Sequence, residues 1–205
     1  MENKENKPVY DPDRYKYAAA GANFLQAKDV GSAKKCLEKL ASDWNLTEDQ
    51  KAGLVWNAFA DDPQTNELGI TKGIGIYAQK YQAEMGKMSI NQMFERYSPE
   101  FNKYLGAEEK EKAKSVFDKL GKETYGSIVE KFTELNDLLN SKSKKANAIK
   151  EKAQKEFDEK YGDVYYTIQD FENLRMSKIM APMQEESVYS NTKERFKPKE
   201  KEKKE

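Results

Sequence analysis

The 205-residue chain has 36 Lys and Arg residues and 36 Asp and Glu residues, so its formal net charge at pH 7 is zero. Charged residues make up 35% of the chain and hydrophobic residues only 37%, which indicates a thin core under a large solvated surface. The balanced charge argues against a dedicated nucleic-acid binder and against tight binding to anionic membranes.

The absence of histidine restricts the chemistry that the chain can perform. Ser-His-Asp and Cys-His nucleophilic systems are excluded, and so are zinc, haem and iron sites with histidine ligands. Carboxylates, Lys, Tyr and Ser remain, but the acidic pairs, such as Glu108 and Glu109, fit first helical turns better than a metal site. We therefore expect no enzymatic activity, no cofactor, no metal and no small-molecule ligand.

Cys36 is the only cysteine, so no disulfide can form within the chain. The preceding Lys34 and Lys35 could lower the pKa of its thiol, but its place beside Leu37 on an amphipathic helix favours a partly buried, unreactive side chain. The first residues lack the apolar core of a signal peptide, and no run is long enough to span a membrane. These features predict a cytoplasmic protein, in a host cytoplasm or a virion if it is viral.

The chain is expected to begin with a polar, disordered arm at residues 1–13, followed by a glycine-containing multi-helix region at residues 14–106. Apolar side chains recur at steps of three and four from Tyr15 to Leu25 and again from Val30 to Trp44. That spacing predicts two successive amphipathic helices.

Part of this stretch resembles a single tetratricopeptide repeat, a helical hairpin. The residues that fall at the family's spacings are Tyr17, Ala20, Gly21, Phe24, Ala33 and Leu37. The resemblance implies a pair of antiparallel helices in which Gly21 and Ala33 allow close approach. The pattern does not recur one repeat length later, so it predicts a hairpin and not a solenoid.

A capping box at Thr47 and Gln50 is expected to open a third helix, which ends before Pro63. Apolar residues from Ile70 to Met88 again recur at steps of three and four and predict a helix, with a short strand near Ile74 as the alternative. The glycines at positions 69, 73 and 75 could cradle a phosphate, but their spacing fits neither phosphate-loop pattern, so a turn or a close helix contact is favoured.

A second capping box, at Ser89 and Gln92, predicts another helix start. Ser98 followed by Pro99 predicts that a new helix begins there, with Ser as the N-cap and Pro in the first turn.

Residues 107–181 are richer in Glu and Lys and are expected to form a helical hairpin or bundle. A seven-residue rhythm of apolar positions starts at Tyr125 and predicts either a short coiled coil or an antiparallel hairpin broken near residues 140–143. Two methionine groups, one of them at the end of this region, could form an adaptable docking face, with ordinary core filling as the alternative. The residues that we expect to mediate interaction are Tyr125, Ile128, Phe132, Leu135, Leu139, Met176, Met180 and Met183.

Residues 182–205 have mixed charge and no apolar periodicity, so we expect a Lys- and Glu-rich disordered tail. A docking arm that orders on a partner is the alternative interpretation of this tail.

The fold class predicted is therefore all-α, and the function predicted is a non-catalytic structural, scaffolding or adaptor role. We expect the chain to act through helix-mediated contacts with protein partners or with further copies of itself, and a larger assembly such as a phage virion is one setting that fits these features. The first alternative is a nucleic-acid-associated protein that uses local lysine patches; the second is a small helical enzyme that depends on carboxylates. The lysine patch in question comprises Lys142, Lys144, Lys145 and Lys150.

Overall fold

The computed structural model describes residues 10–47, 62–141, 147–180 and 192–196. Within these residues the chain is all-α, as predicted, and forms no strand; the one β-bridge pairs Ser89 with Thr124. The predicted helix of residues 48–59 lies outside the described residues, as do residues 1–9 of the N-terminal arm.

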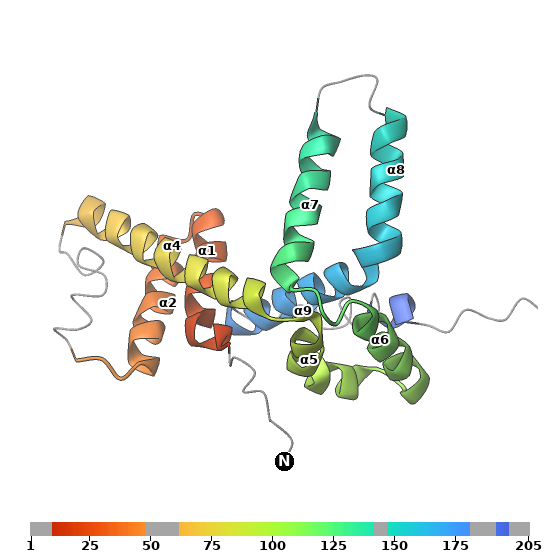
Figure 1. Cartoon of the computed structure of the whole chain (residues 1–205). Helices are drawn as coiled ribbons and strands as arrows, with labels where there is room; N and C mark the ends of the chain where they lie inside the picture. Colours follow the sequence, from red (N-terminus) through yellow and green to blue (C-terminus); the bar gives the residue numbers. More distant parts are fainter. Residues whose placement is uncertain (1–9, 48–61, 142–146, 181–191, 197–205) are drawn as a thin grey trace, which may run out of the picture. The chain divides into compact units, whose positions relative to one another are not determined.

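The chain divides into two compact units between Met85 and Gly86. Four elements belong mainly to the first unit: η1 (Pro12–Tyr15), α1 (Lys16–Gln26), α2 (Val30–Asp43) and α4 (Pro63–Lys87) (Figure 1). The second unit contains α5 (Ile90–Tyr104), α6 (Ala107–Lys119), α7 (Tyr125–Asn140), α8 (Asn147–Phe157), the π-helical turn η3 (Asp158–Gly162) and α9 (Asp163–Met180). Helix α5, which lies before the change of composition at residue 107, packs against α6 and α9 and so belongs to the second unit.

In the first unit, α1 and α2 pack against each other as the predicted hairpin. The carboxylate of Asp29 caps α2 by accepting the Ser32 backbone N–H at 3.0 Å. A Cβ atom at Gly21 would overlap the end of the Ile74 side chain and lie 3.3 Å from Cβ of Cys36. Gly21 therefore allows α1 to approach both α2 and α4 closely.

An aromatic cluster surrounds Trp44, the residue that follows α2. The ring of Trp44 meets Tyr15 and Tyr77 edge to face, with centroid distances of 5.8 and 5.2 Å. The Arg14 guanidinium lies 4.9 Å from the Trp44 ring centroid, and the Trp44 indole N–H donates to the Arg14 carbonyl oxygen at 3.3 Å. The cluster therefore joins η1, α2 and α4.

Helix α4 is continuous across its glycines, which confirms the predicted helix and excludes the strand alternative at Ile74. The Asp62 carboxylate starts the helix by accepting the Thr65 backbone N–H at 2.8 Å and the Thr65 hydroxyl at 2.6 Å. Gly69 and Gly73 are buried within this continuous helix, so these glycines form neither a phosphate loop nor the alternative turn.

The second unit has a core of packed aromatic rings, some stacked and some edge to face. Phe101 on α5 lies 5.0 Å from Phe94, 5.8 Å from Phe117 on α6 and 5.2 Å from Phe171 on α9. These contacts hold three helices together through one side chain, which is less than 2% exposed.

The predicted helix start at Ser98 is wrong, because α5 runs unbroken through Pro99 to Tyr104. Ser98 does not cap a helix; its hydroxyl donates to the Phe94 carbonyl oxygen at 3.1 Å, inside the helix. Tyr97 and Phe101 are buried on either side of Pro99, and this packing outweighs the local proline signal.

The first residues of α5 and α7 are joined by backbone hydrogen bonds near the beginning of the second unit. The Ser89–Gln92 capping box is present, and Thr124 caps α7 by accepting the Ser127 backbone N–H at 3.2 Å. Between the two starts, Ile90 N–H donates to the Glu123 carbonyl at 3.0 Å and Tyr125 N–H to the Met88 carbonyl at 2.9 Å. A Cβ on Gly126 would lie 2.8 Å from the Gly86 carbonyl oxygen, so this junction depends on glycine.

Helices α7 and α8 form an antiparallel hairpin, and α7 ends at Asn140, next to the break predicted near residues 140–143 (Figure 1). The chain then bends sharply at η3, where the π-helical turn joins α8 to α9 (Figure 1). Tyr161 and Gly162 of this turn are buried.

Candidate interaction surfaces

Most of the predicted interaction seam is covered by the chain itself. Tyr125, Ile128 and Leu135 are each at most 7% exposed. Phe132 stacks on Tyr165 of α9 at 4.4 Å and lies 5.6 Å from Phe157 at the end of α8. The seam is therefore packed by α8 and α9 of the same chain, and only its last member, the half-buried Leu139, lies near the hairpin tip.

The predicted methionine face is not assembled by the described residues. Met176 is buried on α9, where it fills the core. The side chain of Met180 and the whole of Met183 lie outside the described residues.

The tip of the α7–α8 hairpin combines an exposed apolar residue with a fixed lysine. Ile149 is 59% exposed. The Lys150 ammonium donates to the carbonyl oxygens of Leu139 at 2.7 Å and Ser141 at 2.6 Å, and so caps the end of α7. Lys150 thus has a structural role, and the other lysines of the proposed nucleic-acid patch, at positions 142, 144 and 145, lie outside the described residues.

The solvent-facing side of α4 presents two large apolar side chains that the sequence analysis did not identify. Leu68 is 63% exposed and Ile76 is 44% exposed. They lie eight positions apart, which is about two helical turns, with the exposed Lys72 midway between them. The available signal was that both residues fall outside the apolar stripe formed by Ile70, Ile74 and Tyr77.

A nearly buried polar network joins α5 to α9. The Glu172 carboxylate accepts the Arg96 guanidinium N–H at 3.3 Å and the Tyr97 hydroxyl at 2.6 Å. The side chains of Arg96 and Glu172 are only 8% and 13% exposed. Because the positive charge and the hydroxyl share one carboxylate, the network fixes the register of the two helices, and removing one partner would leave a buried charge.

Cys36 is buried among α1, α2 and α4, as the sequence predicted. Burial, and secondarily the negative charge of Asp29, raises the pKa of the Cys36 thiol to about 11. The thiol is therefore protonated and a poor nucleophile at neutral pH.

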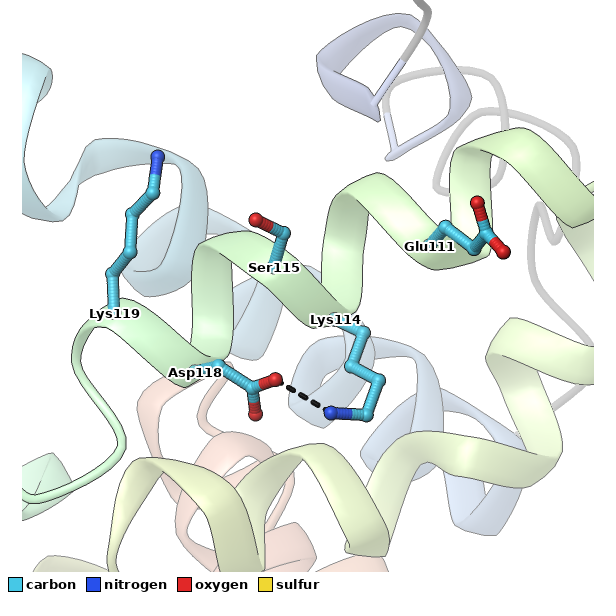
Figure 2. A pocket seen from close by; sticks show the side chains of 5 residues that line it. All are labelled: Glu111, Lys114, Ser115, Asp118 and Lys119. Atoms are coloured by element: carbon cyan, nitrogen blue, oxygen red, sulfur yellow. Dashed lines mark hydrogen bonds and ion pairs between the residues drawn. The ribbon is translucent and has the colours of Figure 1, made fainter.

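The hollows on the surface of the second unit are lined mainly by exposed, charged side chains that pair with one another along a helix. One is lined by Glu111, Lys114, Ser115, Asp118 and Lys119, all from α6 (Figure 2). Within it Lys114 pairs with Asp118 one turn away, at 2.5 Å, while Lys119 points away from both (Figure 2). In the part of the chain that the structure describes, no three His, Cys, Asp or Glu residues are grouped so that they could hold a metal ion.

The predicted disordered tail needs a correction at residues 192–196, which form a helical turn packed on the second unit. Phe196 is fully buried and its ring lies 6.3 Å from that of Phe101. Arg195 pairs with Asp170 on α9 at 2.5 Å. The tail prediction failed here because a single aromatic residue has no periodicity, and the only available signal was the isolated Arg195–Phe196 pair.

None of the helices among residues 10–47, 62–141 and 147–180 is sufficiently long and apolar to cross a lipid bilayer. Comparison of the chain with protein-family models, with curated proteins and with solved structures finds no match.

Proposed function

We propose that the chain is a non-catalytic helical protein that acts as a structural or adaptor component through contacts with other proteins. A larger assembly, such as a phage virion, is the setting that we propose for it. The observation that carries this proposal is the solvent-facing side of α4, where Leu68 and Ile76 are exposed on the same side of the helix.

The chemistry of this α4 face indicates the kind of partner. Its three central exposed side chains are apolar, basic and apolar, at Leu68, Lys72 and Ile76. An amphipathic helix that presents an acidic residue between two apolar residues, one turn apart, would match both the shape and the charge. A second Lys-centred face would place like charges together, so we assign the α4 face to a partner helix with an acidic centre.

The test compares wild-type chain with a Leu68→Glu/Ile76→Glu variant in affinity purification from the native source, followed by titration of the recovered protein against each purified chain. Both side chains are exposed, so the variant should keep the wild-type circular dichroism spectrum. We expect its affinity for the partner to fall by a factor of about 10 or more, because two apolar contacts are replaced by charges.

The matched control is Ser115→Glu/Asn136→Glu, which adds the same two charges at exposed positions of the second unit, on α6 and α7. It should bind like the wild type. If every protein recovered with the wild type binds the Leu68→Glu/Ile76→Glu variant with equal affinity, the proposed role of α4 is wrong.

A further inference from the structure

The helical turn at residues 192–196 is a short element that reaches the second unit through a long connection. Helix α9 ends at Met180, and residues 181–191 lead to Thr192. A connection of that length can span on the order of 40 Å when extended. The connection is therefore long enough for the turn to reach either the second unit of its own chain or that of a neighbouring copy.

The contacts of this turn resemble those of a bound peptide. Phe196 is fully buried, and Phe101 is the aromatic neighbour that its ring meets at a steep angle of 76°. Arg195 supplies a polar contact: it pairs with Asp170 at 2.5 Å, and its guanidinium carbon lies 6.0 Å from the Tyr166 ring centroid. One buried aromatic anchor beside one charge-assisted pair is the pattern that concentrates binding energy at protein interfaces.

The receiving surface is formed by α5 and α9. Phe101 comes from α5, and Tyr166 and Asp170 lie one turn apart on α9. We call these three residues the tail site. The tail site belongs to the rigid aromatic core of the second unit, since Phe101 also packs on Phe117 and Phe171. A site held by core helices stays formed whether or not the turn is bound.

We infer that the tail site is a docking site for a short segment with adjacent basic and aromatic residues, and that residues 192–196 of a second copy of this chain occupy it when chains assemble. The side-chain contacts made by Arg195 and Phe196 are the same whether the turn comes from its own chain or from a neighbour. In dilute solution the covalent connection gives the chain's own turn a local concentration of about millimolar, so the site closes on itself. In an assembly the copies lie close together, so the turn of one chain can bind the tail site of a neighbour and link the two chains.

This inference uses residues separate from the α4 face and either proposal can fail alone. The receptor in the first test is the full chain with Arg195→Ala/Phe196→Ala, which disables its own turn. The ligand is a fluorescent peptide with the sequence of residues 189–199. We expect saturable binding to this receptor, binding to the wild-type chain that is weaker by a factor of about 10 because the wild-type turn competes, and no binding of a peptide that carries the Phe196→Ala change.

A folded receptor that does not distinguish the two peptides would overturn the docking site. If the receptor variant does not fold, limited proteolysis of the wild-type chain decides the matter. We expect chymotrypsin to cut after Phe196 while α5 and α9 remain intact, because the turn detaches without global unfolding. A cut after Phe196 that appears only together with cuts within α5 and α9 would show that the turn is a permanent part of the core, which contradicts the inference.

Sedimentation up to millimolar concentration tests the second copy. The average mass of the wild-type chain should rise with concentration, and that of the Arg195→Ala/Phe196→Ala chain should not. The Leu68→Glu/Ile76→Glu chain should associate like the wild type, which separates this contact from the α4 face. A wild-type chain that stays monomeric throughout would overturn exchange between copies.

Discussion

The two units of this protein bury their helices by different means. The first unit brings α1, α2 and α4 together with small side chains, including Ala18, Ala20, Gly21 and Ala33, so the backbones approach closely. The second unit instead packs α5, α6 and α9 around a group of aromatic rings centred on Phe101. Each aromatic side chain buries about 150–250 Å². The stability of the second unit should therefore depend on a few large side chains, and that of the first unit on many contacts between small side chains.

The largest effect is expected for Phe101→Ala, which removes the ring shared by α5, α6, α9 and the C-terminal turn. The cost should be about 3–5 kcal/mol of the free energy of unfolding of the second unit. Trp44 and Trp56, the only two tryptophans, both precede residue 86, so their emission reports on the first unit. Heating should melt part of the helical circular dichroism signal at a lower temperature while the tryptophan transition is unchanged.

The control for this variant is Leu37→Ala, which removes a fully buried side chain of the first unit. It should lower the temperature of the transition that tryptophan emission reports, because it should reduce the free energy of unfolding of the first unit by about 2–5 kcal/mol. If either substitution shifts both transitions equally, the two units fold as one and the contrast between them loses its meaning.

A smaller effect is expected from adding one methyl group to a glycine in each unit. At Gly126 the new Cβ would lie 2.8 Å from a backbone oxygen, so Gly126→Ala should destabilise the second unit by about 1–3 kcal/mol. At Gly75 nothing lies within 4 Å of the new Cβ, so Gly75→Ala should stabilise α4 by about 0.5–1 kcal/mol. Urea denaturation measures both, and a neutral Gly126→Ala would show that the close approach to Gly86 is not required.

The smallest effect should come from buried tyrosines at alkaline pH. Burial raises the pKa of Tyr125 in the second unit and, by less, that of Tyr77 in the first, above the ordinary value of 10.0. The folded state therefore holds these protons more tightly than the unfolded state. The resulting stability is complete below pH 10 and is lost as the pH rises toward the raised values.

Urea midpoints measured from pH 8 to pH 11 check this prediction. Tyr125→Phe should flatten the alkaline decline more than Tyr77→Phe, because the pKa of Tyr125 is raised further. An unchanged slope in Tyr125→Phe would mean that this phenol is accessible to water in the folded chain.

Apolar periodicity was sufficient to predict the helices but not what covers them. The stripe through Tyr125, Ile128 and Leu135 was correctly placed on one face, but the sequence left open whether a second chain or a hairpin within the chain covers it, and in the structure α8 and α9 provide the cover. Spacing along one helix carries no information on which distant helix folds back onto it. The sequence left open for the same reason whether its two helical regions share one core, since the contact of α5 with α9 joins positions far apart in the sequence.

The candidate surfaces were the least predictable part. Leu68 and Ile76 are exposed because no other part of the described chain covers them. Phe196 is buried by residues that are distant in the sequence and that only the folded core brings together. Local signals were also overruled, as at Pro99, where neighbouring buried aromatics keep the helix intact. Capping boxes succeeded because their partners lie only three residues apart.

The π-helical turn at residues 158–162 has a consequence for how this protein can vary. A π turn holds one more residue than an α turn, so it is equivalent to a single insertion absorbed within a helix. Deleting one residue there would restore ordinary α pairing and rotate α8 by about 100° relative to α9. Phe157 would then leave the stack with Phe132 and Tyr165, and the hairpin would lose its lateral support. Chain length within this turn therefore sets the direction of the hairpin.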